Sequence, residues 1–116
     1  MKRAGSLGGA LLALVLLTSG CSGKVEENTA QGLQLLEQME YENALQCFEM
    51  ALVNGEELRQ ALRGQGLAYM GLGDYENATA CLERALDYAD AWPGQLDYDI
   101  NYYLATAYYK LGQAEQ

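Results

Sequence analysis

GQGLAYMGLGDYENATACLERAL, residues 64–86, decides the fold of this chain. Its small and apolar residues recur with the spacing of amphipathic helices, not with the alternation of a strand. Gly73 and Asp74 interrupt this spacing, and such a pair is typical of a turn. The segment therefore predicts two helices joined by a tight turn, with Asp74 capping the second helix.

The same pattern occurs once more, at a constant offset toward the N-terminus (66 − 32 for the first pair). Small residues on one helix let a neighbouring helix approach closely, and bulky residues fill the space beside them. We therefore expect two similar antiparallel helix hairpins. The equivalent pairs are Gly66 and Gly32, Tyr75 and Tyr41, Ala78 and Ala44, and Ala85 and Ala51.

A 34-residue period with these residues resembles the tetratricopeptide repeat family, whose helix hairpins stack into a solenoid. The resemblance implies an all-α fold of antiparallel helix hairpins in a right-handed solenoid, with repeats at residues 25–58 and 59–92 and a partial third at 98–116. Family positions matched in the second repeat are Gly66, Tyr69, Gly73, Tyr75, Ala78, Leu82 and Ala85; in the first they are Gly32, Leu35, Tyr41, Ala44, Phe48 and Ala51. The departures are Asn28, Leu62 and Asn101 for the early Trp, Met39 for the turn Gly, and Glu56 and Asp90 for the closing Pro.

Helix boundaries follow from the same residues. In the first repeat we expect helices near residues 25–38 and 41–53, with Asn54 and Gly55 as a stop. A loop at residues 91–95 contains Pro93 and Gly94. The partial repeat is expected to be a helix at residues 97–111 followed by a turn at 112–114. The preferred interpretation is a fragment or a face that a partner covers, and the alternative is that this helix caps the solenoid.

The N-terminus resembles a secretory signal, which we place at residues 1–20. Lys2 and Arg3 precede an uncharged apolar run at residues 7–17. That run is short for a membrane span, which needs about 20 mainly apolar residues.

Residues 17–21, LTSGC, resemble the lipobox of bacterial lipoproteins, although Thr18 replaces the commoner aliphatic residue. In that family the Cys is diacylated and becomes the new N-terminus. The resemblance implies lipidation at Cys21, a short tether at residues 21–28, and attachment to the cell membrane or the outer membrane on the extracytoplasmic side. An ordinary signal peptide or an uncleaved anchor helix is the alternative.

Composition narrows the chemistry that the chain could perform. The sequence contains no His, which is the commonest general base and metal ligand. Its net charge is −9, and removal of residues 1–20 leaves five basic and sixteen acidic residues, a net charge of −11. We therefore expect no nucleic-acid partner, no catalytic residues, no metal and no cofactor.

We expect the cysteines of the two repeats and the paired carboxylates to serve the fold and not to take part in catalysis or metal binding. Cys47 and Cys81 occupy equivalent positions of the two repeats, and we interpret them as small, partly buried thiols and not as a disulfide. The pairs Glu56-Glu57 and Asp97-Asp99 lie at expected helix starts, where carboxylates favour the helix dipole.

In the tetratricopeptide repeat family the first helices of the repeats line a concave groove that binds protein or peptide partners. Tyr and Met side chains in such a groove suit a peptide ligand. A basic-and-Asn carboxylate clamp, used by some members, is not visible because Thr29 and Leu33 occupy its first positions. The implied groove residues are Thr29, Ala30, Leu33 and Leu36 from the first repeat, Arg63, Leu67 and Met70 from the second, and Tyr102, Thr106, Tyr109 and Lys110 from the third.

The resulting functional expectation is a membrane-anchored protein interaction module, a scaffold or adaptor of the bacterial cell envelope, and not an enzyme. The alternative is a structural subunit that forms a homo-oligomer through its incomplete third repeat. The sequence alone identifies neither the partner nor the process served.

Overall fold

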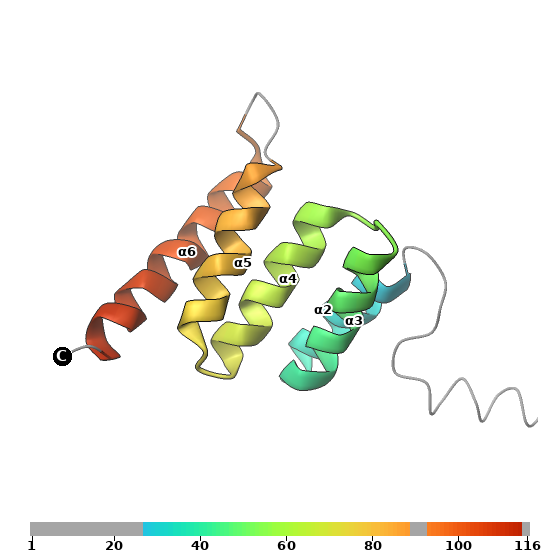
Figure 1. Ribbon diagram of the computed structural model, residues 1–116, viewed down its shortest axis with the longest axis horizontal. Coiled ribbons are helices and arrows are strands. Elements are labelled where there is room, and N and C mark those ends of the chain that lie inside the picture. The colour runs from blue at the N-terminus through green and yellow to red at the C-terminus, as the bar shows by residue number, and fades with distance from the viewer. Residues whose placement is uncertain (1–26, 89–92, 115–116) are drawn as a thin grey trace, which may run out of the picture.

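The computed structural model describes residues 27–88 and 93–114 of the 116-residue chain, and all of their regular secondary structure is helical. Residues 1–26, which include the expected signal peptide and Cys21, lie outside this range. Within residues 27–88 and 93–114, five helices follow one another (Figure 1): α2 (Glu27–Glu37), α3 (Tyr41–Val53), α4 (Leu58–Gly71), α5 (Tyr75–Asp87) and α6 (Gln95–Ala114).

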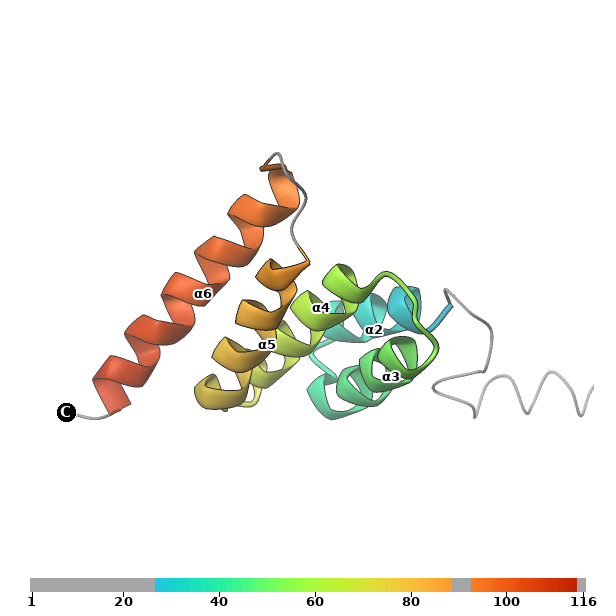
Figure 2. The ribbon, with the colours of Figure 1, turned by 45° about the horizontal axis from the view of Figure 1, so that its top comes forward.

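The helices form two layers. Each helix packs against the next one in the chain, and α4 also contacts α2 and α6. Among the described helices α3 and α5 make no such contact with each other, so α2, α4 and α6 form one layer and α3 and α5 the other. Figures 1 and 2 show α6 at one end of the array and the α2–α3 pair at the opposite end. The predicted all-α stack of helix hairpins is confirmed.

Close helix approach in both hairpins depends on a glycine of the first helix. A Cβ atom on Gly32 would stand 2.6 Å from the Phe48 ring, and a Cβ atom on Gly66 would stand 2.7 Å from Leu82 Cγ. Gly66 and Leu82 each stand one full repeat after Gly32 and Phe48 (66 − 32 and 82 − 48). The 34-residue period of the sequence is therefore a period of packing.

The core consists of two hydrophobic clusters that meet along the array. Ala78 and Ala85 are fully buried, as their spacing predicts. Leu52 contacts both clusters, so the core is continuous across the repeats. The first cluster is built on Ala44, Phe48, Ala51, Ala61 and Ala68, and the second on Leu62, Leu82, Ala85 and Ile100.

Three helices are each followed by a residue in the left-handed conformation. Met39 (φ 62°), Gly55 (φ 72°) and Gly73 (φ 77°) follow α2, α3 and α4. In each case the next residue donates its N–H to a carbonyl five positions back, from Glu40, Glu56 and Asp74 to Leu35, Ala51 and Tyr69, at 2.9 Å. This is the Schellman arrangement, which normally has Gly at the left-handed position.

The boundaries of α6 differ from the prediction. The helix begins at Gln95, two residues before the expected start, and continues through residues 112–114, where a turn was expected. That prediction was wrong because Gly112 does not adopt the left-handed conformation that ends α2, α3 and α4. At the start, the Asp97 carboxylate accepts a hydrogen bond from the Gly94 N–H at 2.6 Å and so caps the helix.

Candidate interaction surface

The layer formed by α2, α4 and α6 carries every residue expected to line a binding groove. Some of these side chains are accessible to solvent, and the others make contacts inside the protein. Ala30, Tyr102, Tyr109 and Lys110 are exposed, Leu67 and Thr106 are half-buried, and Thr29, Leu33, Leu36, Arg63 and Met70 are engaged by other parts of the protein.

The accessible residues concentrate on α6. Tyr102 is 66% exposed and Tyr109 is 65% exposed, which is unusual for such large aromatic side chains. The Thr106 hydroxyl donates to the Tyr102 carbonyl at 2.9 Å, and Gln113 Nε2 donates to the Tyr109 hydroxyl at 3.1 Å. These bonds leave the tyrosine rings free to contact another molecule.

Thr29 is hydrogen-bonded to a carboxylate from the loop between α3 and α4. Its backbone N–H and its hydroxyl both donate to Glu56 Oε1, at 3.2 and 3.1 Å, and Asn28 Nδ2 donates to Glu56 Oε2 at 2.9 Å. All three residues are buried. Glu56 therefore satisfies N–H groups at the start of α2, not at the start of α4 as its position in the sequence had suggested.

The ionisation of Glu56 reflects two opposing effects. Burial raises the pKa of its carboxyl group, but the hydrogen bonds from Asn28, from Thr29 and from Asn54 together lower it, so the pKa lies below its usual value. Glu56 consequently remains a carboxylate at neutral pH and tethers α2 to the loop that precedes α4.

Arg63 is also engaged inside the protein. Its Nε lies 2.5 Å from Asp99 Oδ2 of α6, and its guanidinium lies 5.7 Å from the centre of the Tyr103 ring. Tyr103 in turn packs edge-to-face against Tyr102, with ring centres 5.2 Å apart. Arg63 therefore orients the aromatic end of the surface, although the sequence had suggested a cation directed at a ligand.

A second ion pair strengthens the junction of α4 with α6. The Arg59 guanidinium pairs with the buried Asp97 carboxylate, and its Nε donates to the Ala85 carbonyl near the end of α5 at 3.4 Å. The expectation that Asp97 caps its own helix is confirmed, and the tertiary ion pair is an additional role. In the sequence, the only indication of this ion pair was the presence of two arginines in α4, Arg59 and Arg63, and two aspartates at the start of α6, Asp97 and Asp99.

The remaining expected groove residues contribute to the core. Leu33 and Leu36 pack against the first cluster, and Met70 packs against the second. Their partial exposure leaves some area for a ligand, whereas their main contacts are internal. Their role in partner binding stays a prediction.

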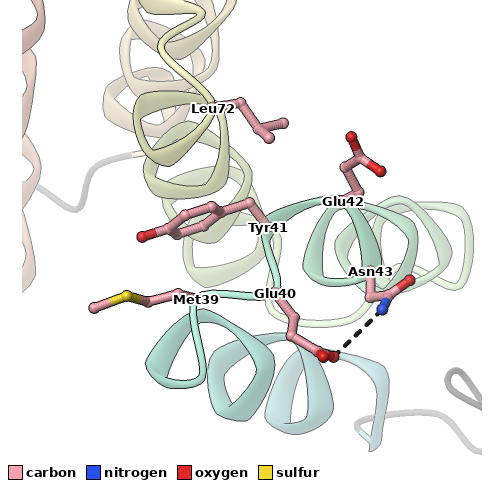
Figure 3. A pocket seen from close by; sticks show the side chains of 6 residues that line it. All are labelled: Met39, Glu40, Tyr41, Glu42, Asn43 and Leu72. Atoms are coloured by element: carbon pink, nitrogen blue, oxygen red, sulfur yellow. Dashed lines mark hydrogen bonds between the residues drawn. The ribbon is translucent and has the colours of Figure 1, made fainter.

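A separate hollow lies outside this layer, beside the turn between α2 and α3. Figure 3 shows the six side chains around it, and its volume is 290 Å³. The Glu40 and Glu42 carboxylates give it an acidic rim, and Asn43 Nδ2 donates to Glu40 Oε2 at 3.3 Å. None of the predicted groove residues lines this hollow, whose residues are Met39, Glu40, Tyr41, Glu42, Asn43 and Leu72.

The cysteines of the two repeats are not joined to each other. Cys81 is a buried free thiol, and its Sγ donates to Gln65 Oε1 at 3.5 Å. Burial raises the pKa of Cys81 and keeps the thiol protonated. Cys47 is fully buried in α3 and is disulfide-bonded, so the predicted thiol is confirmed for Cys81 and wrong for Cys47.

Two further properties concern the described part of the chain. Residues 27–88 and 93–114 contain no group of three His, Cys, Asp or Glu side chains that could hold a metal ion. Of the five helices α2 to α6, none combines the length and the hydropathy needed to cross a bilayer.

Comparison with known families agrees with the geometry. The sequence profile of the tetratricopeptide repeat family matches residues 29–95 and residues 63–116. The offset between the starts of the two matches (63 − 29) equals the period of the packing. The chain therefore belongs to the tetratricopeptide repeat family.

Members of this family generally mediate protein–protein interaction and are typically non-catalytic. A search of curated proteins and a search of solved structures found no match.

Proposed function

We propose that this protein is a membrane-anchored interaction module of the bacterial cell envelope, which binds a protein or peptide partner on the layer formed by α2, α4 and α6. The observation that carries the proposal is the exposure of Tyr102 and Tyr109 on this layer of a tetratricopeptide repeat protein. Tyr side chains provide a large contact area at low cost in conformational entropy. Because most of the expected groove residues on α2 and α4 make internal contacts, the accessible aromatic surface of this layer lies mainly on α6.

Charge and stiffness support the same proposal. The chain is acidic, with a net charge of −9, which favours partners that carry basic residues. The ion pairs of Arg59 and Arg63 hold α6 against α4. Tyr102 and Tyr109 therefore project from a helix whose position is fixed.

Partner binding can be tested with a displayed library of random short peptides. Peptides enriched on the full chain should bind the double variant Tyr102→Ala/Tyr109→Ala at least about tenfold more weakly, because central aromatic side chains dominate binding energy. Leu67→Glu, on α4, should have a similar effect. The control is Tyr88→Ala, an exposed tyrosine at the end of α5 in the other layer. Equal binding to all four proteins would exclude this surface.

The anchor rests on the resemblance of LTSGC, residues 17–21, to a lipobox. Two or three acyl chains on Cys21 would hold the domain at a bilayer, whereas one chain binds only marginally. The full chain, expressed in a bacterium, should partition into detergent and gain the mass of lipid, and Cys21→Ser should remain unprocessed or be released.

Equal partitioning of wild type and Cys21→Ser would remove the lipoprotein assignment. A digest under non-reducing conditions gives an independent check, because a sulfur that carries a thioether-linked lipid cannot also form a disulfide. Recovery of Cys21 in a disulfide would therefore contradict lipidation at this residue.

A further inference from the structure

Helix α6 has an apolar stripe on the side that faces away from α5. Residues 98, 102, 105 and 109 recur at the spacing i, i+4, i+7 and i+11, which places them on one line along the helix. Tyr98 is 64% exposed and Tyr102 and Tyr109 are similarly exposed, whereas Ile100 and Ala107 on the other side are fully buried. Figure 2 shows α6 at the end of the array, with α5 covering only one of its sides.

The stripe carries no charge, although one residue in five of the chain is charged. Helix α6 contains three charged residues, and none of them belongs to the stripe. Asp97 and Asp99 pair with arginines of α4, and Lys110 lies on the flank. Enrichment in Tyr together with depletion of charge is the composition of an interface core.

The order of large and small residues in the stripe is self-complementary. Tyr98 and Tyr109 are equally far from its midpoint, and so are Tyr102 and Ala105. When two such helices lie antiparallel about a two-fold axis, Tyr102 of each copy faces Ala105 of the other, and Tyr98 faces Tyr109. We propose that the protein forms a two-fold symmetric dimer in which the α6 helices of two copies pack antiparallel through this stripe.

The flanks of the stripe favour the antiparallel order. Asp99 and Lys110 lie on the same flank, near opposite ends of the helix. Antiparallel packing brings Lys110 of one copy near Asp99 of the other, twice. Parallel packing about a two-fold axis would put this flank of the two copies on opposite sides of the contact, so Lys110 and Asp99 would not meet.

The expected contact is small. Three tyrosines and the alanine, with the flanking polar residues, bury roughly 1,000 Å² in total over both copies, below the roughly 1,200 Å² at which stable interfaces begin. The two copies also repel each other, since each has a net charge of −9. The dimer is therefore dependent on concentration, and added salt strengthens it by screening this repulsion.

The dimer does not require the proposed peptide binding, but it uses two of the same side chains. Tyr102 and Tyr109 belong both to the stripe and to the partner surface. Self-association and partner binding at α6 consequently exclude one another. Leu67 on α4 lies outside the stripe, so Leu67→Glu separates the two: it should weaken peptide binding and leave the dimer unchanged.

Native mass spectrometry of the full chain, released from detergent micelles at several concentrations, measures the dimer fraction. Ala105→Tyr should weaken the dimer at least tenfold because two tyrosines would then compete for one space, and Tyr102→Ala should weaken it by leaving a gap. The exchange variant Tyr102→Ala/Ala105→Tyr restores one large and one small residue at each contact and should recover the dimer. The control is Ala80→Tyr, at an exposed position of α5.

Cross-linking tests the antiparallel order separately. A chain with Tyr102→Cys mixed with a chain with Ala105→Cys should be joined by a short thiol cross-linker far more efficiently than either chain with itself. Wild type measures the background from native cysteines. A monomer at every concentration, a dimer insensitive to Ala105→Tyr, or preferential joining of two Tyr102→Cys chains would each overturn the proposal, whatever the result of the peptide selection.

Discussion

The packing of α3 on α4 and the packing of α5 on α6 fill equivalent positions with different side chains. In the first contact Phe48 occupies the space beside Gly32 and Gly64, where a Cβ atom on Gly64 would stand 2.2 Å from Phe48 Cζ. In the second contact Leu82 takes the place of Phe48. Tyr103 takes the place of Gly64 at an offset of 39 residues, the spacing between Gly73 and Gly112, because the loop before α6 adds five residues to the 34-residue period. A large residue faces a glycine in one contact, and a smaller residue faces a tyrosine in the other.

This difference shows that the repeats maintain the filled volume of a contact more closely than the identity of each residue. Ala61 and Ile100 follow the same rule, since the alanine packs in the cluster of Phe48 and the isoleucine in the cluster of Leu82. Close-packed interiors penalise both voids and overlaps, so a change on one helix constrains the facing helix.

Truncation of Phe48 should have the largest effect. Phe48→Ala is expected to lower the free energy of unfolding by about 4 kcal/mol, and Leu82→Ala by less, because Phe48 contacts glycines of two helices. Urea denaturation followed by circular dichroism measures both. Val53→Ala, at an exposed position of α3, should change stability by less than about 0.5 kcal/mol. A larger loss for Leu82→Ala would break the comparison.

A pair of substitutions at Phe48 and Gly64 tests directly whether the filled volume of the contact is what the repeats maintain. Gly64→Ala should cost about 2–3 kcal/mol by overpacking. In the Phe48→Leu background, which imitates the second contact, the same change should cost much less, because the shorter side chain leaves room for the new methyl group. A double-mutant cycle by urea denaturation gives the coupling. Additive effects would show that the two positions do not share space.

Glycine at an uncrowded position is the control for that cycle. A Cβ atom on Gly112 of α6 would meet no atom within 4 Å. Gly112→Ala should therefore leave stability unchanged or raise it by up to about 1 kcal/mol through helix propensity.

The polar contact of Glu56 with α2 predicts a dependence on pH. Because the folded pKa of Glu56 is lowered, its contribution is complete above the ordinary glutamate pKa of about 4.3 and is lost as the pH falls through the folded value. Glu56→Gln should cost about 2 kcal/mol at pH 7 and progressively less in acid. Stability curves of both proteins between pH 7 and pH 3 measure this. A constant difference across the range would contradict the lowered pKa.

Substitutions in the turns are expected to have the smallest effect on stability. Met39 and Gly73 hold equivalent left-handed positions, and Met39 is 73% exposed. Met39→Gly should raise stability by about 1 kcal/mol through relief of backbone strain, and Gly73→Met should lower it by a similar amount. Thermal unfolding measures both. Destabilisation by Met39→Gly would mean that the Met39 side chain contributes more than its backbone costs.

Local sequence patterns predicted the helices and their ends with few errors. Turns at Gly55 and Gly73 could be located because the left-handed conformation favours glycine. The first turn was located only through the 34-residue register, because Met39 carries no such signal. Gly112 gave a false signal, since glycine permits a turn but does not impose one.

The interaction surface was predicted less completely. Register placed the expected groove residues on one layer of helices, and Tyr102 and Tyr109 are exposed there. Register could not reveal that Thr29 is bound by Glu56 or that Arg63 is bound by Asp99, because those partners lie 27 and 36 residues away. Lipidation of Cys21 and partner binding stay predictions.

The sequence by itself determined the helix hairpins, their 34-residue period and the alanines and glycines at which helices approach, because these depend on local periodicity and residue size. The tertiary structure decided which polar groups are paired and which tyrosines are left outside, because both depend on contacts between helices distant in the chain. Glu56 illustrates the difference. Its position suggested a cap for the helix that follows it, and only the folded arrangement shows its carboxylate at the start of α2.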